Sequence, residues 1–302
     1  MNTDDFLGGL IKIYRRLLPE KIRLIIRPFG LRVWRYVQRF FLNTTRAFVI
    51  DFHAVDHCNL NCAHCLHFSP LAPETFVDPA DYEKDCIQLS KILKKIRVMN
   101  IMGGEPLLHP RLAEFIYITR KYFKSAKISI LTNGLLLLKQ NEEFWKSCAK
   151  NNAQILVSYY PVNLNYSEIE NTAKKYNARI IFAERDRQYM TKFPLSVEAV
   201  STAKKNHGKC PYAYSWSVPL KDGKLFPCFT SAYSGFFNDY FKKNMDITEE
   251  DYLDIYKVKT RSEVIKFLNK PIPFCKYCNT SKIVQGLTWE RSKFEISEWT
   301  VN

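Results

Sequence analysis

Three cysteines lie within eight residues of this 302-residue chain, in the order Cys58-Asn-Leu-Asn-Cys62-Ala-His-Cys65. Three thiolates in one loop can hold a four-iron cluster, and such clusters are usually closed by four cysteines. No fourth cysteine is close, because Cys86 follows a Pro-rich stretch and falls inside a helical pattern. We therefore expect one iron to lack a protein ligand and to be open to a small molecule.

Two other uses of these thiols remain open. A zinc ion could take the three sulfurs together with an imidazole from His57, His64 or His67. Disulfides are the weaker alternative, because the chain has nine cysteines, no cleavable signal peptide and enough length to fold without cross-links. These features favour a reducing cytoplasm.

A second motif follows, where the apolar run 97–102 enters the turn Gly103-Gly104-Glu105-Pro106. Glycine permits a close backbone approach, so we expect this turn to lie against a ligand. The C-x3-C-x2-C spacing, placed after one apolar run and before this turn, resembles the signature of the radical S-adenosylmethionine (SAM) superfamily. The resemblance implies a cluster held by Cys58, Cys62 and Cys65, with SAM on its open iron.

The same resemblance implies further cofactor contacts. The turn Gly103–Pro106 would receive the SAM amino group through its backbone and its glutamate. His64 stands just before the third cysteine, where the family usually has an aromatic residue. Thr132, Asn133 and Ser158 close two predicted strands, where the family contacts the SAM ribose and carboxylate. A common Thr-Asn-Gly turn and a polar residue at a sheet edge would also explain these three.

Apolar β-rich runs alternate with amphipathic stretches, which is the pattern of a parallel α/β fold. Asp78-Pro79 is a start signal for the first helix of the core. The resemblance makes this fold a partial (β/α)6 barrel of the TIM type, whose ligands meet at the carboxyl ends of the strands. Cys86 and Cys148 fall in helical patterns and are expected to be buried. We predict strands near 47–55, 97–102, 127–132, 153–159 and 178–183, and helices near 79–95, 110–123, 136–150 and 165–177.

A second set of cysteines lies beyond this core, at Cys210, Cys228, Cys275 and Cys278. Asp222-Gly223 between two short apolar runs is a hairpin signal, and Cys228 follows the returning strand. The set resembles the auxiliary-cluster extension called SPASM, in the shortened form called twitch. That resemblance implies one further four-iron cluster closed by all four thiolates. A structural zinc site of four thiolates would use the same residues.

The first 46 residues differ in charge from the rest of the chain. Ten Lys or Arg minus three acidic residues leave this segment with +7 of the chain's net +15. Apolar residues are interleaved with these charges, so we expect basic amphipathic helices, broken near Pro19 and Pro28. That profile suits an anionic membrane surface, although no apolar stretch reaches the roughly 20 residues of a spanning helix. A helical hairpin packed on the barrel is the alternative. Charge alone would also allow nucleic acid, but no recognition motif is present.

These features predict a basic helical leader over 1–46, a radical SAM core over 47–207 and a twitch-like domain over 208–302. The resemblance implies reductive cleavage of SAM to a 5′-deoxyadenosyl radical, which removes hydrogen from a substrate carbon. A single, fully ligated auxiliary cluster favours oxidation of a sugar or cyclitol alcohol, in surface-polysaccharide or related metabolism, with flavodoxin or ferredoxin as reductant. Peptide modification and a non-catalytic, membrane-associated metal-binding protein are the alternatives. We expect a cytoplasmic location, with peripheral membrane contact if the leader binds lipid.

Overall fold

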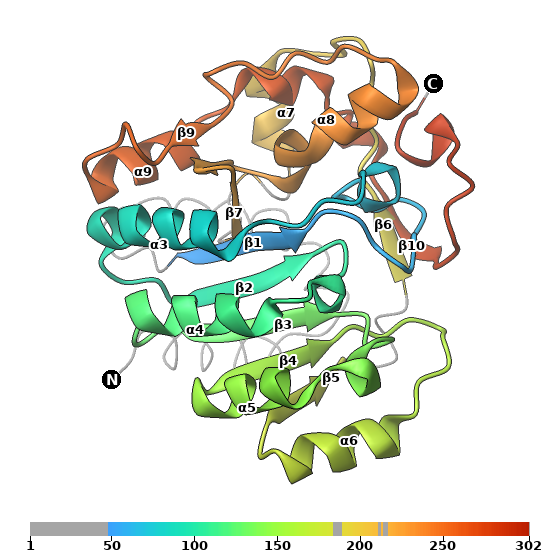
Figure 1. Ribbon diagram of the computed structural model, residues 1–302. Helices are drawn as coiled ribbons and strands as arrows, with labels where there is room; N and C mark the ends of the chain where they lie inside the picture. Colours follow the sequence, from blue (N-terminus) through green and yellow to red (C-terminus); the bar gives the residue numbers. More distant parts are fainter. Residues whose placement is uncertain (1–47, 184–188, 211–212, 214–216, 302) are drawn as a thin grey trace, which may run out of the picture. The chain divides into compact units, whose positions relative to one another are not determined.

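The structure, a computed structural model, describes residues 48–183, 189–210, 213 and 217–301. The predicted leader, 1–46, lies outside the described residues. Residues 47–302 form one compact unit. Within it a twisted sheet carries helices on one face, and the C-terminal third of the chain lies beyond one edge of the sheet's first five strands (Figure 1).

Five parallel strands form the core of the sheet. They lie in the order β5-β4-β3-β2-β1, so strands consecutive in the chain are neighbours in space. Every pair among them is parallel, which confirms the predicted parallel α/β fold, and each strand overlaps its predicted range. The strands are β1 (Val49–Val55), β2 (Val98–Gly103), β3 (Lys127–Thr132), β4 (Ala153–Val157) and β5 (Arg179–Phe182).

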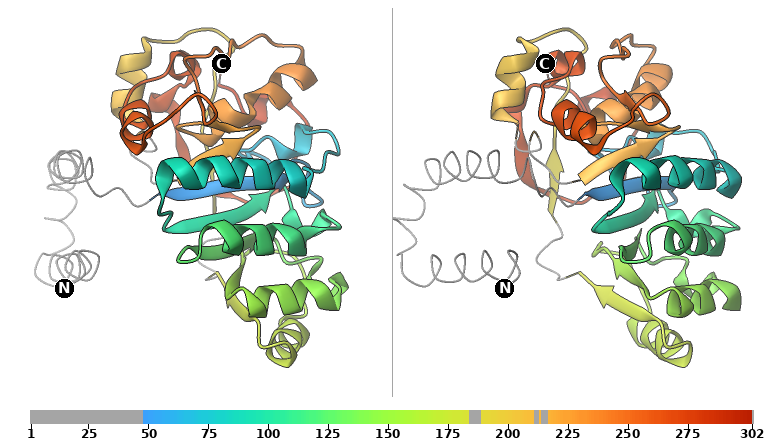
Figure 2. Two further views of the ribbon diagram at one scale, coloured as in Figure 1. Left: turned by 60° about the vertical axis from the view of Figure 1, so that its left-hand side comes forward. Right: turned by 90° about the vertical axis from the view of Figure 1, so that its left-hand side faces the viewer.

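Four helices alternate with these strands and cover one face of the sheet (Figures 1 and 2). They are α3 (Pro79–Leu93), α4 (Leu112–Tyr122), α5 (Glu142–Lys150) and α6 (Tyr166–Lys175). Phe52 of β1 faces them, since its ring centroid lies 4.2 Å from that of Tyr82 in α3 and 5.7 Å from that of Phe115 in α4. Side chains alternate along a strand. Asp51 and His53 therefore point to the opposite face of the sheet.

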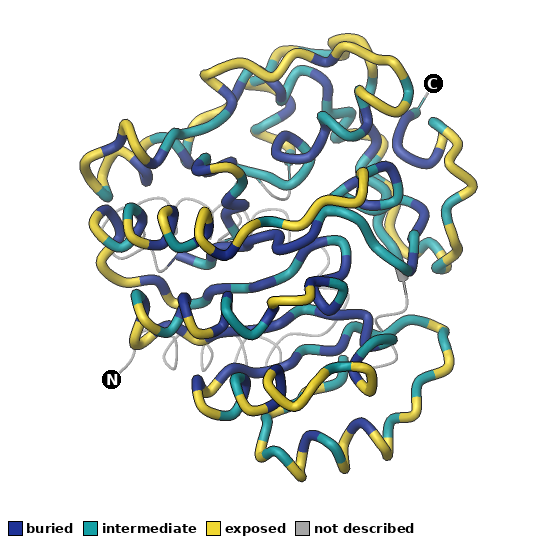
Figure 3. The backbone as a smooth tube through the Cα atoms, viewed as in Figure 1, coloured by how far each residue is buried: buried dark blue, intermediate teal, exposed yellow. Residues whose placement is uncertain are grey.

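Burial follows this arrangement, with the darkest segments along the core strands and the inner sides of the helices (Figure 3). Cys86 and Cys148 are 0% exposed, as predicted. The predicted helix 136–150 is wrong in its first part, because α5 begins only at Glu142. The Asn141 side chain accepts a hydrogen bond from the Phe144 backbone N–H at 3.0 Å and so starts a new helix after a short 3-10 turn.

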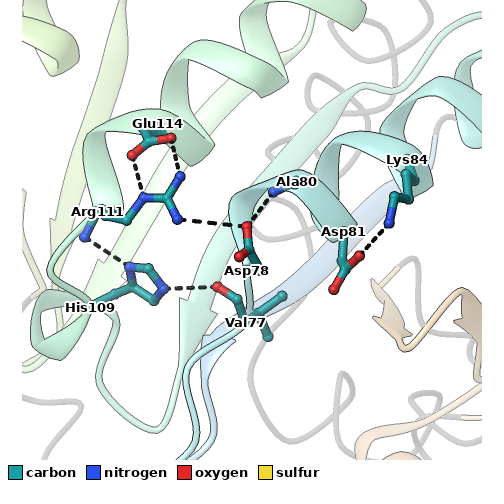
Figure 4. Close-up of polar contacts among 8 residues, drawn as sticks. All are labelled: Val77, Asp78, Ala80, Asp81, Lys84, His109, Arg111 and Glu114. Carbon is teal, nitrogen blue, oxygen red and sulfur yellow. Dashed lines mark hydrogen bonds and ion pairs between the residues drawn. The ribbon is translucent and has the colours of Figure 1, made fainter.

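The start of α3 is bound to the loop that follows β2 (Figure 4). Asp78 caps α3 by accepting from the Ala80 N–H at 2.8 Å, and Arg111 lies 3.6 Å from the same carboxylate. His109 joins the two segments: Nε2 donates to the Val77 carbonyl oxygen at 2.9 Å, and Nδ1 accepts from the Arg111 N–H at 3.0 Å. Both ring nitrogens of His109 therefore hold the loop after β2 in place.

The sixth parallel strand does not extend the sheet beyond β5. It is β7 (Ser217–Lys221), which pairs with β1 at the other edge, and β8 (Lys224–Leu225) and β9 (Leu253–Asp254) continue the sheet antiparallel. Val218, Leu220 and Leu225 are buried in the same apolar cluster as the core strands, and this burial holds the added strands against β1. β6 (Tyr189–Lys192) instead pairs antiparallel with β10 (Val284–Thr288) in a separate sheet.

The Asp222-Gly223 hairpin is confirmed. Leu220 pairs with Leu225, and the two turn residues have φ angles of 50° and 69°, the left-handed backbone that a tight two-residue hairpin requires. The sheet thus continues across the predicted boundary at residue 208, and a separate twitch-like domain stays a prediction. The remaining helices are α7 (Ala203–Lys209), α8 (Phe229–Phe241) and α9 (Arg261–Leu268).

Candidate active site

The first cysteine loop leaves β1 at its carboxyl end. Asn61, His64 and Phe68 have φ angles of 51°, 61° and 53°, so the chain reverses direction repeatedly within a few residues. These reversals bring the thiols close enough to affect one another. Burial first, and then the neighbouring Cys65 and Cys58, raise the pKa of Cys62 to about 12. The structure therefore brings together the three predicted cluster ligands.

Hydrogen-bond donors point at each of these sulfurs. The Leu60 N–H donates to Cys58 Sγ at 3.4 Å, and the Trp289 indole N–H donates to Cys62 Sγ at 3.0 Å. Burial raises the pKa of Cys65, while the Ser69 and His67 backbone N–H groups oppose that rise. Such donors stabilise a thiolate, the form that binds metals. The chemistry of this donor set fits a cluster held by three thiolates.

A single metal ion would need ligands that converge on one point, whereas a cluster would not. In the part of the chain that the structure describes, no group of three or more His, Cys, Asp or Glu side chains could hold one metal ion. The thiolates of a four-iron cluster bind different irons and therefore need not converge on one point. His64 is directed at the C-terminal end of the chain, where its Nδ1 donates to the Glu298 carbonyl oxygen at 2.6 Å. Measuring the iron and zinc contents of the protein would distinguish a four-iron cluster from a single zinc ion at this site.

The glycine pair after β2 lies against the chain's own backbone. The Gly104 N–H donates to the Val55 carbonyl oxygen at 2.8 Å, and the Glu105 N–H donates to that of His57 at 3.1 Å. A Cβ atom on Gly103 would lie 2.1 Å from the Val55 oxygen, and one on Gly104 would lie 2.1 Å from the His57 oxygen. The close approach that these glycines permit is thus to the segment entering the cysteine loop. Contact of Gly103–Pro106 with SAM stays a prediction.

Glu105 is fully buried and nearly saturated with donors. Its Oε1 accepts from the Thr132 hydroxyl at 2.6 Å and the Leu107 N–H at 3.1 Å, and its Oε2 accepts from the Asn133 N–H at 2.8 Å. Burial raises the pKa of Glu105 to about 7, and these donors limit the rise. A carboxylate offers about four acceptor positions. One position, on Oε2, therefore remains for a cation.

The other predicted SAM contacts lie beside Glu105, at the carboxyl ends of β3 and β4. The Asn133 side chain donates to Asn59 Oδ1 at 2.8 Å, and its Nδ2 lies 3.9 Å from Cys58 Sγ. The half-buried Ser158 extends the strand pairing, since its N–H donates to the Thr132 carbonyl oxygen at 2.9 Å. The structure thus gathers Thr132, Asn133 and Ser158 at one edge next to the cysteine loop. Their contacts with the SAM ribose and carboxylate remain predictions.

The second set of cysteines comes together from three segments. Cys210 follows α7, Cys228 precedes α8, and Cys275 and Cys278 lie in and just after a 3-10 turn over Pro273–Tyr277. Burial first, and then the nearby Cys228 and Cys210, raise the pKa of Cys275 to about 12. Burial, Cys228, Cys275 and Cys210 likewise raise that of Cys278. The group has the composition of a fully ligated site, and the identity of its metal stays a prediction.

Sequence reasoning missed residues 289–299, which we call the C-terminal strap. The Ala63 N–H donates to the Glu290 carbonyl oxygen at 3.0 Å, and the Ser292 N–H donates to that of Asn61 at 2.7 Å. The Trp299 indole N–H donates to the Cys65 carbonyl oxygen at 2.9 Å. The strap thus lies over the cysteine loop, beside the carboxyl ends of the strands (Figure 1). Two tryptophans in a mostly polar segment were its only signal in the sequence.

Sequence reasoning also missed a buried polar cluster next to the loop. His53 of β1 is 3% exposed, and its ring stacks on that of Tyr233 in α8 with centroids 3.9 Å apart. Its Nδ1 lies 3.0 Å from Asp56 Oδ1, while His53 Nε2 and the Tyr233 hydroxyl have no hydrogen-bond partner among the described residues. The ring of His67, two residues after Cys65, stacks on Phe229, the residue after Cys228, at 4.4 Å. The cluster therefore joins the segment that follows Cys65 to the segment that follows Cys228.

The protonation states in this cluster follow from burial. Burial lowers the pKa of His53, so its imidazole is neutral near pH 7. Burial raises the pKa of Asp56, but the hydrogen bond and charge of His53, with Lys221, outweigh this and lower it. An ionised carboxylate only accepts, so Nδ1 of His53 carries the proton and Nε2 offers a lone pair. A polar residue in the buried run of β1 was the signal for this site.

Comparison with known proteins shows which family the region carrying this site resembles. Residues 53–187 match the radical SAM superfamily. A GTP 3′,8-cyclase of Helicobacter pylori (strain HPAG1) is 33% identical over 107 residues, which cover 33% of this chain and 32% of that protein. The antilisterial bacteriocin subtilosin biosynthesis protein AlbA of Bacillus subtilis (strain 168) is 36% identical over 97 residues, which cover 32% of this chain and 20% of AlbA.

The chain therefore spans a third or less of the length of these relatives. A crystal structure of BtrN in complex with AdoMet and 2-DOIA has 19% identity and a TM-score of 0.49, over 77% of this chain and 93% of that chain. The cysteine loop and the Gly-Gly-Glu-Pro turn both fall inside the matched residues. Residues 53–187 are a radical SAM domain, an enzyme domain whose cofactors are a four-iron cluster and S-adenosylmethionine.

Proposed function

We propose that this protein is a radical SAM enzyme that oxidises an alcohol group on a small hydroxylated molecule, such as a sugar or cyclitol. The observation that carries the proposal is the buried, stacked His53–Tyr233 pair, in which the described residues leave the acceptor Nε2 of His53 and the hydroxyl of Tyr233 without a partner. When bound, the cluster and SAM supply a 5′-deoxyadenosyl radical that removes a hydrogen atom from an unactivated carbon.

Several residues would bind and orient these cofactors. Cys58, Cys62 and Cys65 would hold the cluster, and the acceptor position left on Glu105 Oε2 would take the SAM amino group. The strap excludes water from the same loop through its hydrogen bonds to the backbone of Asn61, Ala63 and Cys65. Exclusion of water protects a reactive species from side reactions.

The polar cluster would manage the proton of the substrate alcohol. Asp56 holds the Nδ1–H tautomer of His53, which leaves Nε2 to accept the hydroxyl proton as the carbon is oxidised. The Tyr233 hydroxyl would donate a hydrogen bond to the same substrate oxygen. Each buried, unpartnered polar group costs about 1–3 kcal/mol. A substrate hydroxyl satisfies both groups at once.

Alcohol oxidation also releases one electron after hydrogen-atom and proton removal. Cys210, Cys228, Cys275 and Cys278 would hold a second four-iron cluster, which could accept that electron but has no iron open to substrate. The stacked rings of His67 and Phe229 bring the segment that follows Cys65 into contact with the segment that follows Cys228. An external one-electron reductant such as flavodoxin or ferredoxin would serve the first cluster.

Hydrogen transfer from a mixture of candidate molecules tests the proposal before the substrate is identified. Anaerobically reconstituted protein is incubated with SAM, dithionite and extracts of deuterium-grown cells, separated into small-molecule and peptide fractions. Deuterium should appear in 5′-deoxyadenosine with the small-molecule fraction, and a new carbonyl should be trapped by a hydrazine. Transfer from the peptide fraction alone would contradict the alcohol proposal.

Two matched pairs of variants locate the chemistry. Tyr233→Phe should raise the free energy of unfolding but reduce turnover, because its buried hydroxyl has no hydrogen-bond partner among the described residues. Tyr82→Phe should instead cost about 1 kcal/mol with turnover kept, since the Tyr82 hydroxyl is bonded to Thr119 at 2.7 Å. His53→Gln should stop carbonyl formation, whereas His109→Gln should mainly destabilise the fold. Normal turnover in Tyr233→Phe and His53→Gln would refute this assignment of roles.

Peptide modification is the second candidate function, favoured by the similarity to a bacteriocin biosynthesis protein.

A separate proposal concerns the leader: we propose that residues 1–46 dock on an anionic membrane. No helix in the described ranges is long and apolar enough to cross a bilayer. Deleting 1–46 should abolish sedimentation with anionic vesicles, and salt should weaken binding of the full chain. Unchanged vesicle binding after the deletion would refute membrane docking.

A further inference from the structure

The strap holds its position by pairing with the cysteine loop in register. Cys62 and Arg291 form an antiparallel bridge, flanked by the backbone hydrogen bonds of Ala63 with Glu290 and of Ser292 with Asn61. These bonds set the residue that precedes them, Trp289, directly over the loop. Backbone pairing on both sides of Cys62 limits the positions that the Trp289 ring can take.

The Trp289 indole N–H donates to Cys62 Sγ at 3.0 Å, and the sulfur is on a residue that is only 7% exposed. Tyr160 packs beside the indole, with ring centroids 6.1 Å apart. The sulfur is therefore shielded from water, and a hydrogen bond to it is stronger than one in water. An N–H aimed at a thiolate is also charge-assisted.

Hydrogen bonds to cluster sulfurs set the reduction potential of an iron–sulfur cluster. Reduction adds one negative charge, which is shared with the cysteine sulfurs. A donor therefore stabilises the reduced form more than the oxidised form, and raises the potential. We propose that Trp289 is a positioning residue that raises the reduction potential of the cluster on Cys58, Cys62 and Cys65 through its N–H bond to Cys62. This inference rests on the proposed function, which places the cluster on these cysteines.

The strap contains its own control. Trp299 is 3% exposed and donates its indole N–H at 2.9 Å to the Cys65 backbone carbonyl, not to a sulfur. Trp289→Phe and Trp299→Phe thus remove the same group from the same segment. Only the first removes a donor to a ligand sulfur.

The experiment is a redox titration of the full-length, reconstituted variants, followed by electron paramagnetic resonance. Added SAM identifies the signal of the first cluster, because only that cluster has an open iron. At a fixed potential, Trp289→Phe should lower the reduced-to-oxidised ratio about tenfold, a shift of about 59 mV to more negative potential for a one-electron couple. Trp299→Phe should leave the potential unchanged while lowering stability.

The outcomes distinguish this inference from the proposed function. If the wild type shows no SAM-sensitive cluster signal, the proposed function fails. If the signal is present and Trp289→Phe has the wild-type potential, the role of Trp289 is refuted. Should Trp289→Phe lose the cluster, benzothienylalanine at position 289 keeps the two-ring shape and removes only the N–H. An unchanged potential with that analogue would overturn the inference equally.

Discussion

The two cysteine sites differ in how the chain assembles them. The first has three cysteines within eight residues, placed by a loop with repeated left-handed backbone. The second joins Cys210, Cys228, Cys275 and Cys278 from three segments that meet only because α7, α8 and the turn at Pro273–Tyr277 pack together. A local site is specified by nearby backbone geometry, whereas a site assembled from distant segments depends on the whole of the surrounding fold.

The local site is nonetheless not independent of the fold. The Cys62 sulfur and the loop backbone receive hydrogen bonds from the strap, and the sequence separation between Trp289 and Cys62 is 227 residues. The glycine pair after β2 lies against the backbone that enters its loop. The comparison therefore predicts that ligand changes act separately on the two sites, while a change in the packing beside the first loop disrupts the first site as well.

Removal of the first ligand set should have the largest effect. Replacing Cys58, Cys62 and Cys65 by Ala should reduce the iron content from about eight to about four atoms per chain and abolish SAM cleavage. The second site should keep its metal, because its ligands come from other segments. Iron, sulfide and zinc analysis of anaerobic protein measures this. Loss of all metal would show that the two sites do not form separately, and stoichiometric zinc would overturn the second cluster.

Cys228→Ala should act on the other site alone. It removes one of four ligands, so we expect the second cluster to be lost, SAM cleavage to continue and carbonyl formation to stop. Metal analysis with product assays measures both effects. Cys148→Ala is the control, since this buried helical cysteine lies outside both sets and should keep both metals. Full carbonyl yield from Cys228→Ala protein that lacks its cluster would contradict electron acceptance there.

Packing of the first site is tested at Gly104. Gly104→Ala would place a Cβ atom 2.1 Å from the His57 carbonyl oxygen, so the backbone entering the loop must move. We expect a loss of more than about 2 kcal/mol in the free energy of unfolding, together with loss of the first cluster. Denaturation and iron analysis provide the readout. In Gly235→Ala in α8, the added Cβ atom meets no described residue within 4 Å, so this variant should gain about 0.5–1 kcal/mol in the free energy of unfolding.

The smallest effect is expected from the protonation of Glu105. Because burial raises its pKa to about 7, the carboxyl is neutral below that pH and cannot pair with the SAM amino group. SAM affinity should therefore rise with pH up to about 7, about tenfold per unit well below the pKa. Anaerobic equilibrium dialysis between pH 5.5 and 8 measures this. Glu105→Gln should bind weakly at every pH, and a pH-independent wild type would exclude the role of Glu105.

The raised pKa of Glu105 gives the stability of the SAM-free protein the opposite pH dependence to that of SAM binding. A carboxyl whose pKa is raised in the folded state stabilises the SAM-free protein fully below the unfolded pKa of about 4.5. That contribution is lost as pH rises through about 7. The SAM-free wild type should thus lose stability relative to Glu105→Gln between these pH values, which denaturation at several pH values would reveal.

Periodic apolar patterns determined the five parallel strands and their helices, because alternation and helical spacing are local properties of the chain. The Asp222-Gly223 hairpin and the first cysteine loop were also readable, since both depend on neighbouring residues. Asn141 shows the limit of this reading, because one capping side chain moved the start of α5. Tertiary structure alone decided that β7 pairs with β1, that His53 meets Tyr233 and that Trp289 covers Cys62. Residues 227 positions apart carry no periodic signal of their contact, so only the packing of the folded chain brings them together.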